Sequence, residues 1–136
     1  MDKTPLGNEV LDFEPANLPQ EYLAAIGLVA ASAAHTEDII EMAIAGLLQV
    51  DGEMGYAVTA HMPAPLRGSV LRSAAEIRIE SGAALDELDI LLDRITTAQG
   101  GRNELLHGSW CRKPSTGEVF VVSQEARTHV TMTSNP

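Results

Sequence analysis

The sequence predicts an all-α fold, an antiparallel four-helix bundle followed by a short C-terminal β-hairpin. Three observations support this class. Apolar residues recur at spacings of three and four through most of residues 20–98. Glycines and prolines interrupt this periodicity where helices are expected to end. After Gly108 the pattern changes to two short runs typical of strands, separated by a turn that contains Pro and Gly.

The first half of the chain is expected to hold one long helix. Residues 1–19 contain three prolines and are predicted to form an irregular lead-in. Residues 20–50 follow as helix, either continuous or as two helices joined near His35-Thr36. That junction contains no Gly or Pro, which favours one continuous helix. Residues 52–64, with two glycines and Pro63, are predicted to form a loop.

The second half is expected to hold the other helices. Residues 65–80 and 83–98 each carry an apolar stripe, and Ser81 is placed to cap the second of them. Gly100-Gly101 costs roughly 2 kcal/mol relative to alanine in a helix interior, so we expect a kink before residues 102–107 continue the helix.

The chain ends in a predicted hairpin, with strands at residues 109–112 and 119–122. A hairpin is marginal by itself, so it is expected to pack on the helices or on a second chain. Residues 128–136 are polar and expected to fray. The expected organisation is therefore a lead-in at 1–19, a helical bundle at 20–110 and a hairpin with a frayed tail at 111–136.

Composition limits the classes of function. A chain of 136 residues fits one domain with a core of its own. Its single cysteine, Cys111, cannot form an internal disulfide, and no Cys or His pair shows zinc-ligand spacing. We therefore expect no metal and no cofactor. The N-terminus lacks signal-peptide character, and the apolar stretch 23–34 is shorter than the roughly 20 residues of a membrane span. A cytoplasmic protein without a membrane partner is expected.

The charge is unevenly distributed. The formal net charge of −10 opposes non-specific binding to nucleic acid. However, four of the nine basic residues lie in residues 94–113, a stretch that holds only one acid, Glu104. These basic residues are Arg94, Arg102, Arg112 and Lys113. A local positive site on an acidic protein is therefore compatible with the sequence.

The residues with the most specific chemistry are Arg102-Asn103-Glu104-Leu105-Leu106-His107, which have the form Arg, polar residue, three residues, His. This motif resembles that of the HEPN superfamily, whose ribonucleases carry Arg-x4-6-His on a late helix of a helical bundle. The resemblance covers about residues 20–110 in architecture. It implies metal-independent cleavage of RNA, in which a 2′-hydroxyl attacks the adjacent phosphate, by a homodimer whose two motifs face a common cleft.

Each residue type suits a step of that chemistry. His107 can transfer a proton at neutral pH, and Arg102 can stabilise charge that develops on the phosphate. Asn103 can orient His107 or donate to the substrate. Glu37 is a supporting candidate, because its place on the inner stripe of the first helix requires a cationic partner, either Arg102 or Arg94. A structural ion pair is the simpler interpretation of Glu37.

Two functions from different classes follow. The first is a HEPN-type endoribonuclease that acts as a toxin or phage-defence component, for which the resemblance suggests a nucleotidyltransferase-type antitoxin as partner. The alternative is a non-catalytic HEPN-like dimerisation or interaction module, which the acidity favours. A small-molecule-binding bundle is a weaker third hypothesis, because two Phe, two Tyr and one Trp offer little for a ligand pocket.

Overall fold

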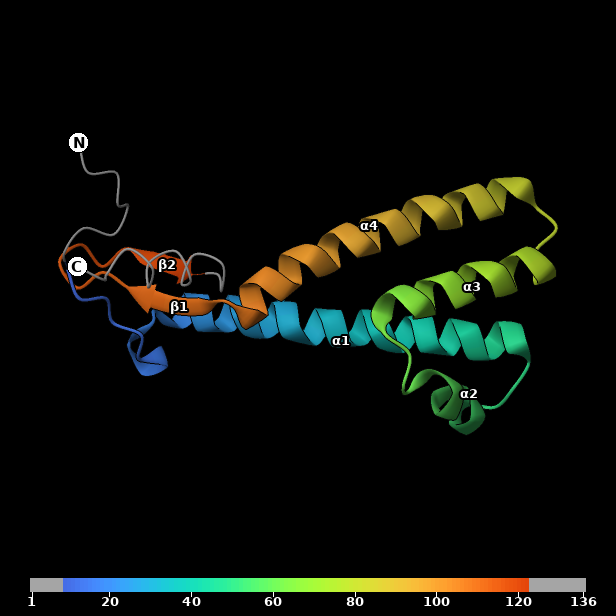
Figure 1. The fold of residues 1–136 in the computed structure, drawn as a ribbon, viewed down its shortest axis with the longest axis horizontal. Coiled ribbons are helices and arrows are strands. Elements are labelled where there is room, and N and C mark those ends of the chain that lie inside the picture. Colours follow the sequence, from blue (N-terminus) through green and yellow to red (C-terminus); the bar gives the residue numbers. More distant parts are fainter. Residues whose placement is uncertain (1–8, 123–136) are drawn as a thin grey trace, which may run out of the picture. The chain divides into compact units, whose positions relative to one another are not determined.

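The computed structural model describes residues 9–122 (Figure 1). These residues form two compact units, one of residues 29–102 and one of residues 9–28 together with 103–122. The prediction of a helical fold with a terminal hairpin is confirmed. The order of the elements is a 3-10 turn at Pro15–Asn17, α1 at Gln20–Leu48, α2 at Gly52–Thr59, α3 at Ala64–Arg78, α4 at Gly82–His107, β1 at Ser109–Arg112 and β2 at Val119–Val122. The predicted fraying at 128–136 lies outside the described residues.

Helix α1 is continuous through His35-Thr36, as the absence of Gly and Pro there predicts. It ends where Gln49 adopts the left-handed conformation, with φ of 57°, and the Val50 N–H donates to the Ala45 carbonyl. By length and composition alone, α1 is the one helix among residues 9–122 that could cross a membrane.

The prediction of a loop over residues 52–64 is wrong for its first part, because residues 52–59 form α2. Asp51 caps this helix, its Oδ1 accepting from the Met54 N–H at 2.7 Å. Gly55 lies so close to α1 that a Cβ atom built on it would stand 2.5 Å from the Cβ of Ala45. Gly55 therefore allows α1 and α2 to pack closely. In the sequence alone, a glycine with this function cannot be distinguished from a glycine in a loop.

The predicted kink at Gly100-Gly101 is also wrong, since α4 runs unbroken from Gly82 to His107. Among the described residues, no atom lies within 4 Å of the place where a Cβ would stand on either glycine, apart from the adjoining backbone of α4. The predicted cap is present, because the Ser81 hydroxyl accepts from the Ala84 N–H at 3.3 Å. The helix therefore accommodates the low helix propensity of both glycines without a bend.

The core of unit 29–102 is small. Three large apolar side chains are buried there, those of Ile40 and Ile44 on α1 and Leu71 on α3. Half-buried apolar side chains pack around them: Ala43, Leu47, Val70, Leu88, Leu92 and Ile95. Figure 1 shows α2 and α3 beside the C-terminal half of α1. Helix α4 contributes only half-buried side chains, and none of its residues is buried.

The other unit is built around the hairpin. The strands pair antiparallel, with Cys111 opposite Phe120, and Cys111 is fully buried. The Trp110 indole N–H donates to the Leu105 carbonyl at 2.8 Å, and its ring meets the edge of Tyr22. The lead-in joins the hairpin through a bridge between Asp12 and Arg112.

Candidate functional site

Two of the predicted site residues, Arg102 and Glu37, form an ion pair that joins α4 to α1. Arg102, near the end of α4, donates from Nη1 to Glu37 Oε1 of α1 at 3.1 Å. The two side chains are 23% and 30% exposed, so water screens the pair only in part. Of the two cations considered for Glu37, the structure places Arg102 beside it.

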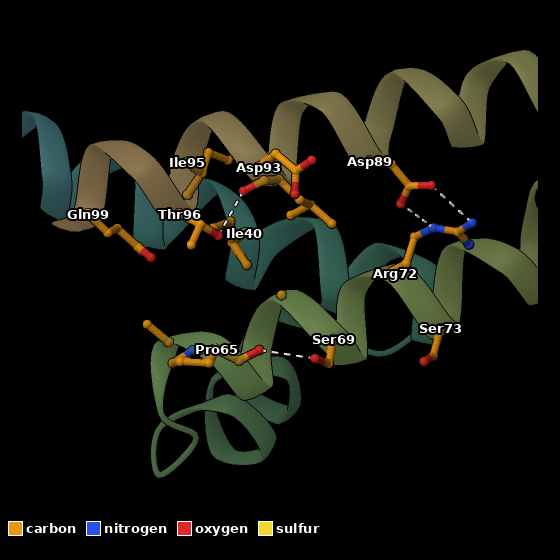
Figure 2. A pocket seen from close by; sticks show the side chains of 13 residues that line it. Ile40, Pro65, Ser69, Arg72, Ser73, Asp89, Asp93, Ile95, Thr96 and Gln99 are labelled. Atoms are coloured by element: carbon orange, nitrogen blue, oxygen red, sulfur yellow. Dashed lines mark hydrogen bonds and ion pairs between the residues drawn. The ribbon is translucent and has the colours of Figure 1, made fainter.

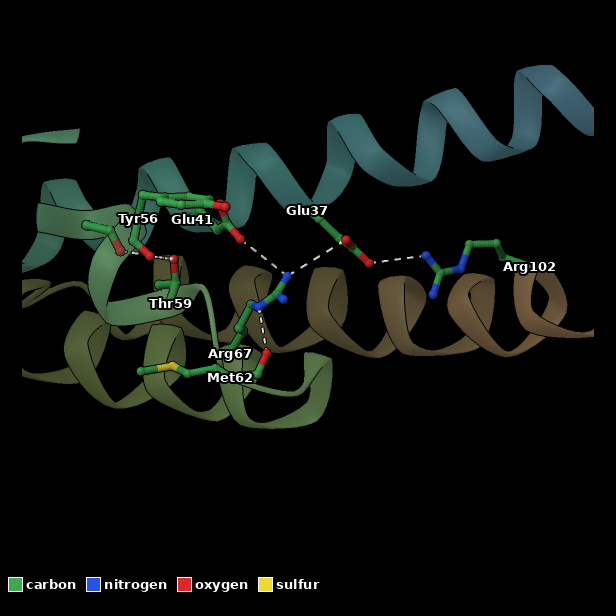
Figure 3. A network of polar contacts seen from close by, with 8 residues as sticks. Glu37, Glu41, Tyr56, Thr59, Met62, Arg67 and Arg102 are labelled. Carbon is green, nitrogen blue, oxygen red and sulfur yellow. Dashed lines mark hydrogen bonds and ion pairs between the residues drawn. The ribbon is translucent and has the colours of Figure 1, made fainter. Parts of the chain in front are cut away.

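A second arginine faces the same carboxylate. Arg67 of α3 lies 3.8 Å from Glu37 Oε2 and 3.4 Å from Glu41 Oε1. Its Nε donates to the Met62 carbonyl at 3.0 Å, which holds the side chain in place. Figure 3 shows Arg67 and Arg102 on opposite sides of Glu37.

Sequence reasoning missed Arg67, although one signal pointed to it. Glu37 and Glu41 stand four residues apart on one helix face, an arrangement that is destabilising for two like charges. A cation between them removes that repulsion. The spacing therefore calls for a basic residue, but no local pattern says which of the nine basic residues supplies it.

The four side chains form a balanced cluster of two guanidinium groups and two carboxylates. All are half-buried, so each pair stabilises the fold modestly. A phosphate that approaches Arg102 has to share this cation with Glu37. A guanidinium carries five N–H donors, so it can hold a carboxylate and a phosphate oxygen at the same time.

The other motif residues continue along α4. Asn103 and His107 are exposed, and His107 is the last residue of the helix. In a regular helix, five residues give a turn of about 140° beyond a full circle and a rise of about 7.5 Å. Arg102 and His107 therefore project from different sides of α4. The boundary between the two compact units falls within this motif, after Arg102.

A groove of about 660 Å³ lies between α3 and α4 (Figure 2). Ile40 and small residues such as Gly68 and Ser69 line it. Arg72 crosses the groove to Asp89, with a 2.6 Å contact from Nε to Oδ1. Asp93 adds a second carboxylate to its wall. This excess of acid makes the groove a poor site for a phosphate group.

Within residues 9–122, no group of three or more His, Cys, Asp or Glu side chains is arranged to hold a metal ion. Comparisons of the chain with protein-family models, curated proteins and solved structures give no match. The features of this chain that bear on its function are therefore the motif, the helical fold and the cluster around Glu37.

Proposed function

We propose that the protein is a metal-independent endoribonuclease of the HEPN type. The observation that carries the proposal is Arg102, anchored to Glu37 and followed five residues later by an exposed His107 at the end of a long helix. When a 2′-hydroxyl cleaves the adjacent phosphodiester, a cation can stabilise the charge that builds on the phosphate and an imidazole can transfer a proton.

In the proposed reaction, the 2′-hydroxyl oxygen attacks the adjacent phosphorus and the bond from phosphorus to the 5′-oxygen breaks. The products are a 2′,3′-cyclic phosphate and a 5′-hydroxyl. His107 accepts the proton of the 2′-hydroxyl, and the departing 5′-oxygen takes a proton from water. Arg102 stabilises the extra negative charge on the phosphate oxygens. Glu37 acts as a positioning residue, because its carboxylate limits the rotation of the Arg102 side chain.

The proposed active form is a cytoplasmic homodimer in which both motifs face a common cleft. Arg102 and His107 project from different sides of one helix, so a site that combines these residues from two copies brings them together most simply. Toxin or phage-defence activity, with a nucleotidyltransferase-type antitoxin, is part of the same proposal. Growth arrest on expression, relieved by Arg102→Ala or His107→Ala, is its expected sign.

The decisive experiment incubates purified protein with total RNA in the presence of EDTA. Wild type is expected to leave cyclic phosphate ends, whereas Arg102→Ala and His107→Ala leave RNA intact. His35→Ala is the matched control, since His35 is an exposed helical histidine outside the motif. Cleavage is expected to continue in that control. Cleavage that persists in His107→Ala, or a folded wild type inactive on several RNA classes, would reject the enzyme.

A mixing experiment tests the shared cleft. Arg102→Ala and His107→Ala copies each retain the residue that the other lacks. If the site combines side chains from two copies, mixed dimers regain one complete site and part of the activity. An inactive mixture that forms dimers would place the site within a single chain.

The second candidate function is a non-catalytic interaction module. It is favoured by the neutralisation of Arg102 by Glu37 and by the net charge of −10, both of which oppose RNA binding. In that case no RNA is cleaved, while Arg102→Ala still weakens the packing of α4 on α1. The experiment in EDTA separates the two functions.

A further inference from the structure

Helix α4 presents apolar side chains that the described residues leave about half exposed. Ile90 and Leu91 are 55% and 52% exposed, and none of the 26 residues of the helix is buried. The inner stripe, which includes Leu88 and Ile95, packs on the core of unit 29–102. Ile90 therefore belongs to a second face of the same helix, and Leu91 lies at the edge between this face and the inner stripe.

This second face, which we name the α4 face, repeats at spacings of three and four. All of its members are exposed: Ala83, Glu87, Ile90, Leu91, Arg94, Ala98 and Gly101. Its two ends carry small residues that allow a close helix approach. Glu87 and Arg94 stand two helical turns apart, a rise of about 10.5 Å, so they cannot pair within one helix. Among residues 9–122, neither side chain has an ion-pair partner.

We propose that the α4 face binds the same face of a second copy of this chain, with the two helices antiparallel. A two-fold axis between Ile90 and Leu91 sets each Ile90 against Leu91 of the second copy. The same axis sets Glu87 opposite the second copy's Arg94 and Ala83 opposite its Ala98. The interface then contains two ion pairs, two contacts between small residues and a central apolar patch.

Charge complementarity selects this partner and this direction. With a net charge of −10 on each chain, two copies repel each other over most of their surfaces. The α4 face brings one acid and one base from each copy, so its own charge is zero. In a parallel pair, Glu87 would stand near Glu87 and Arg94 near Arg94. Charges that flank a helix interface commonly determine its orientation in this way.

The α4 face is separate from the motif and does not depend on the proposed ribonuclease. From an axis between Ile90 and Leu91, each Arg102 lies about 17 Å along the helix, in opposite directions. The motif end of each α4 stays available for a second contact between copies. The α4 contact alone gives two copies, and the two contacts together give four when their two-fold axes cross at right angles.

Exchange of the charges tests the proposal. The molar mass in solution is measured for wild type, Arg94→Glu and Glu87→Arg. Each single variant is expected to halve the number of copies, because two acids or two bases then meet. An equimolar mixture of the two variants is expected to regain the wild-type mass, because one copy then carries acids at both positions and the other copy carries bases at both. Asp86→Arg, an equal change of charge at the neighbouring exposed position, is the control and keeps the wild-type mass.

Cross-linking tests the register independently. Copies with Ala83→Cys and copies with Ala98→Cys are expected to form a mixed disulfide under mild oxidation. Either variant alone is expected to stay unlinked, because like positions lie about 22 Å apart along an antiparallel pair. Cys111 does not interfere, since it is fully buried. A monomeric wild type, an unchanged mass for Arg94→Glu, a mixture that fails to associate, or Ala83→Cys linked to itself would each overturn the proposal.

Discussion

The guanidinium of Arg102 lies 3.1 Å from the carboxylate of Glu37, although 65 positions separate the two residues along the chain. This contact ties the end of α4 to the middle of α1 within one compact unit. It also determines which cation Glu37 holds, because Arg94, the other candidate from the sequence, is exposed elsewhere on α4.

A double-mutant cycle should measure this coupling. Glu37→Ala and Arg102→Ala are each expected to lower the free energy of unfolding, and the double variant to lose less than their sum. The expected coupling energy is about 1 kcal/mol, because the pair is only partly screened by water. Urea denaturation supplies the four values. A parallel cycle with Arg94→Ala in place of Arg102→Ala is the control and should show a coupling near zero.

Ile44→Ala should destabilise the chain most among the changes in α1. Ile44 has no exposed surface, and its truncation leaves a cavity in a core of three large side chains. The expected loss is about 3 kcal/mol in the free energy of unfolding. Ile39→Ala removes the same atoms from a side chain that is 52% exposed, and should change the stability by less than about 1 kcal/mol. Equal effects at the two positions would contradict the described core.

The glycines of α2 and α4 should respond in opposite directions. Gly55→Ala forces a Cβ against Ala45 and should destabilise the fold by about 1–3 kcal/mol. Gly100→Ala meets open space in the interior of α4 and should stabilise it by about 1 kcal/mol, because alanine favours the helix. Thermal unfolding followed by circular dichroism measures both. Destabilisation by Gly100→Ala would indicate a bend at that position.

The attachment of the lead-in to the hairpin should weaken in acid. The Ser115 hydroxyl, followed by the Ser115 N–H and the nearby Lys113, lowers the pKa of Glu9 from its ordinary value of 4.5. Because the folded pKa lies below the unfolded one, the stabilisation is complete above about pH 4.5 and disappears as the pH falls through the folded pKa.

An NMR titration of the Glu9 carboxyl tests this dependence. In wild type the midpoint is expected below 4.5, and in Ser115→Ala it should move up toward 4.5. Ser73→Ala, a serine of α3 remote in sequence from Glu9, should leave the midpoint unchanged. A Glu9 midpoint at or above 4.5 in wild type would show that the Ser115 contact does not form in solution.

Local patterns predicted most of the elements. The 3.6-residue periodicity gave the long helices, and the Pro-Gly turn gave the strands at 109–112 and 119–122 with the observed bounds. The two errors both involve glycine. Propensity predicts a loop at Gly55 and a kink at Gly100-Gly101, because it does not show whether a missing Cβ allows a close contact or only lowers stability.

The candidate site was predictable only where it depends on a motif. Arg102, Asn103 and His107 form a pattern in one short segment, and Glu37 could be chosen from its place on an apolar stripe. Arg67 could not be found in this way. It reaches Glu37 and Glu41 from another helix, and its position depends on how α3 packs on α1. Contacts of this kind follow from tertiary packing, which no local pattern encodes.

The buried thiol of Cys111 in β1 can be used to measure opening of the fold. Its one thiol lies in the hairpin unit, whereas the core of Ile40, Ile44 and Leu71 lies in the other. A thiol reagent can reach this sulfur only when the hairpin unit opens. Labelling rates would therefore measure the frequency of local unfolding in that unit. The free energy of opening from these labelling rates can be compared with the free energy of global unfolding. Equal values would show that the two units unfold cooperatively.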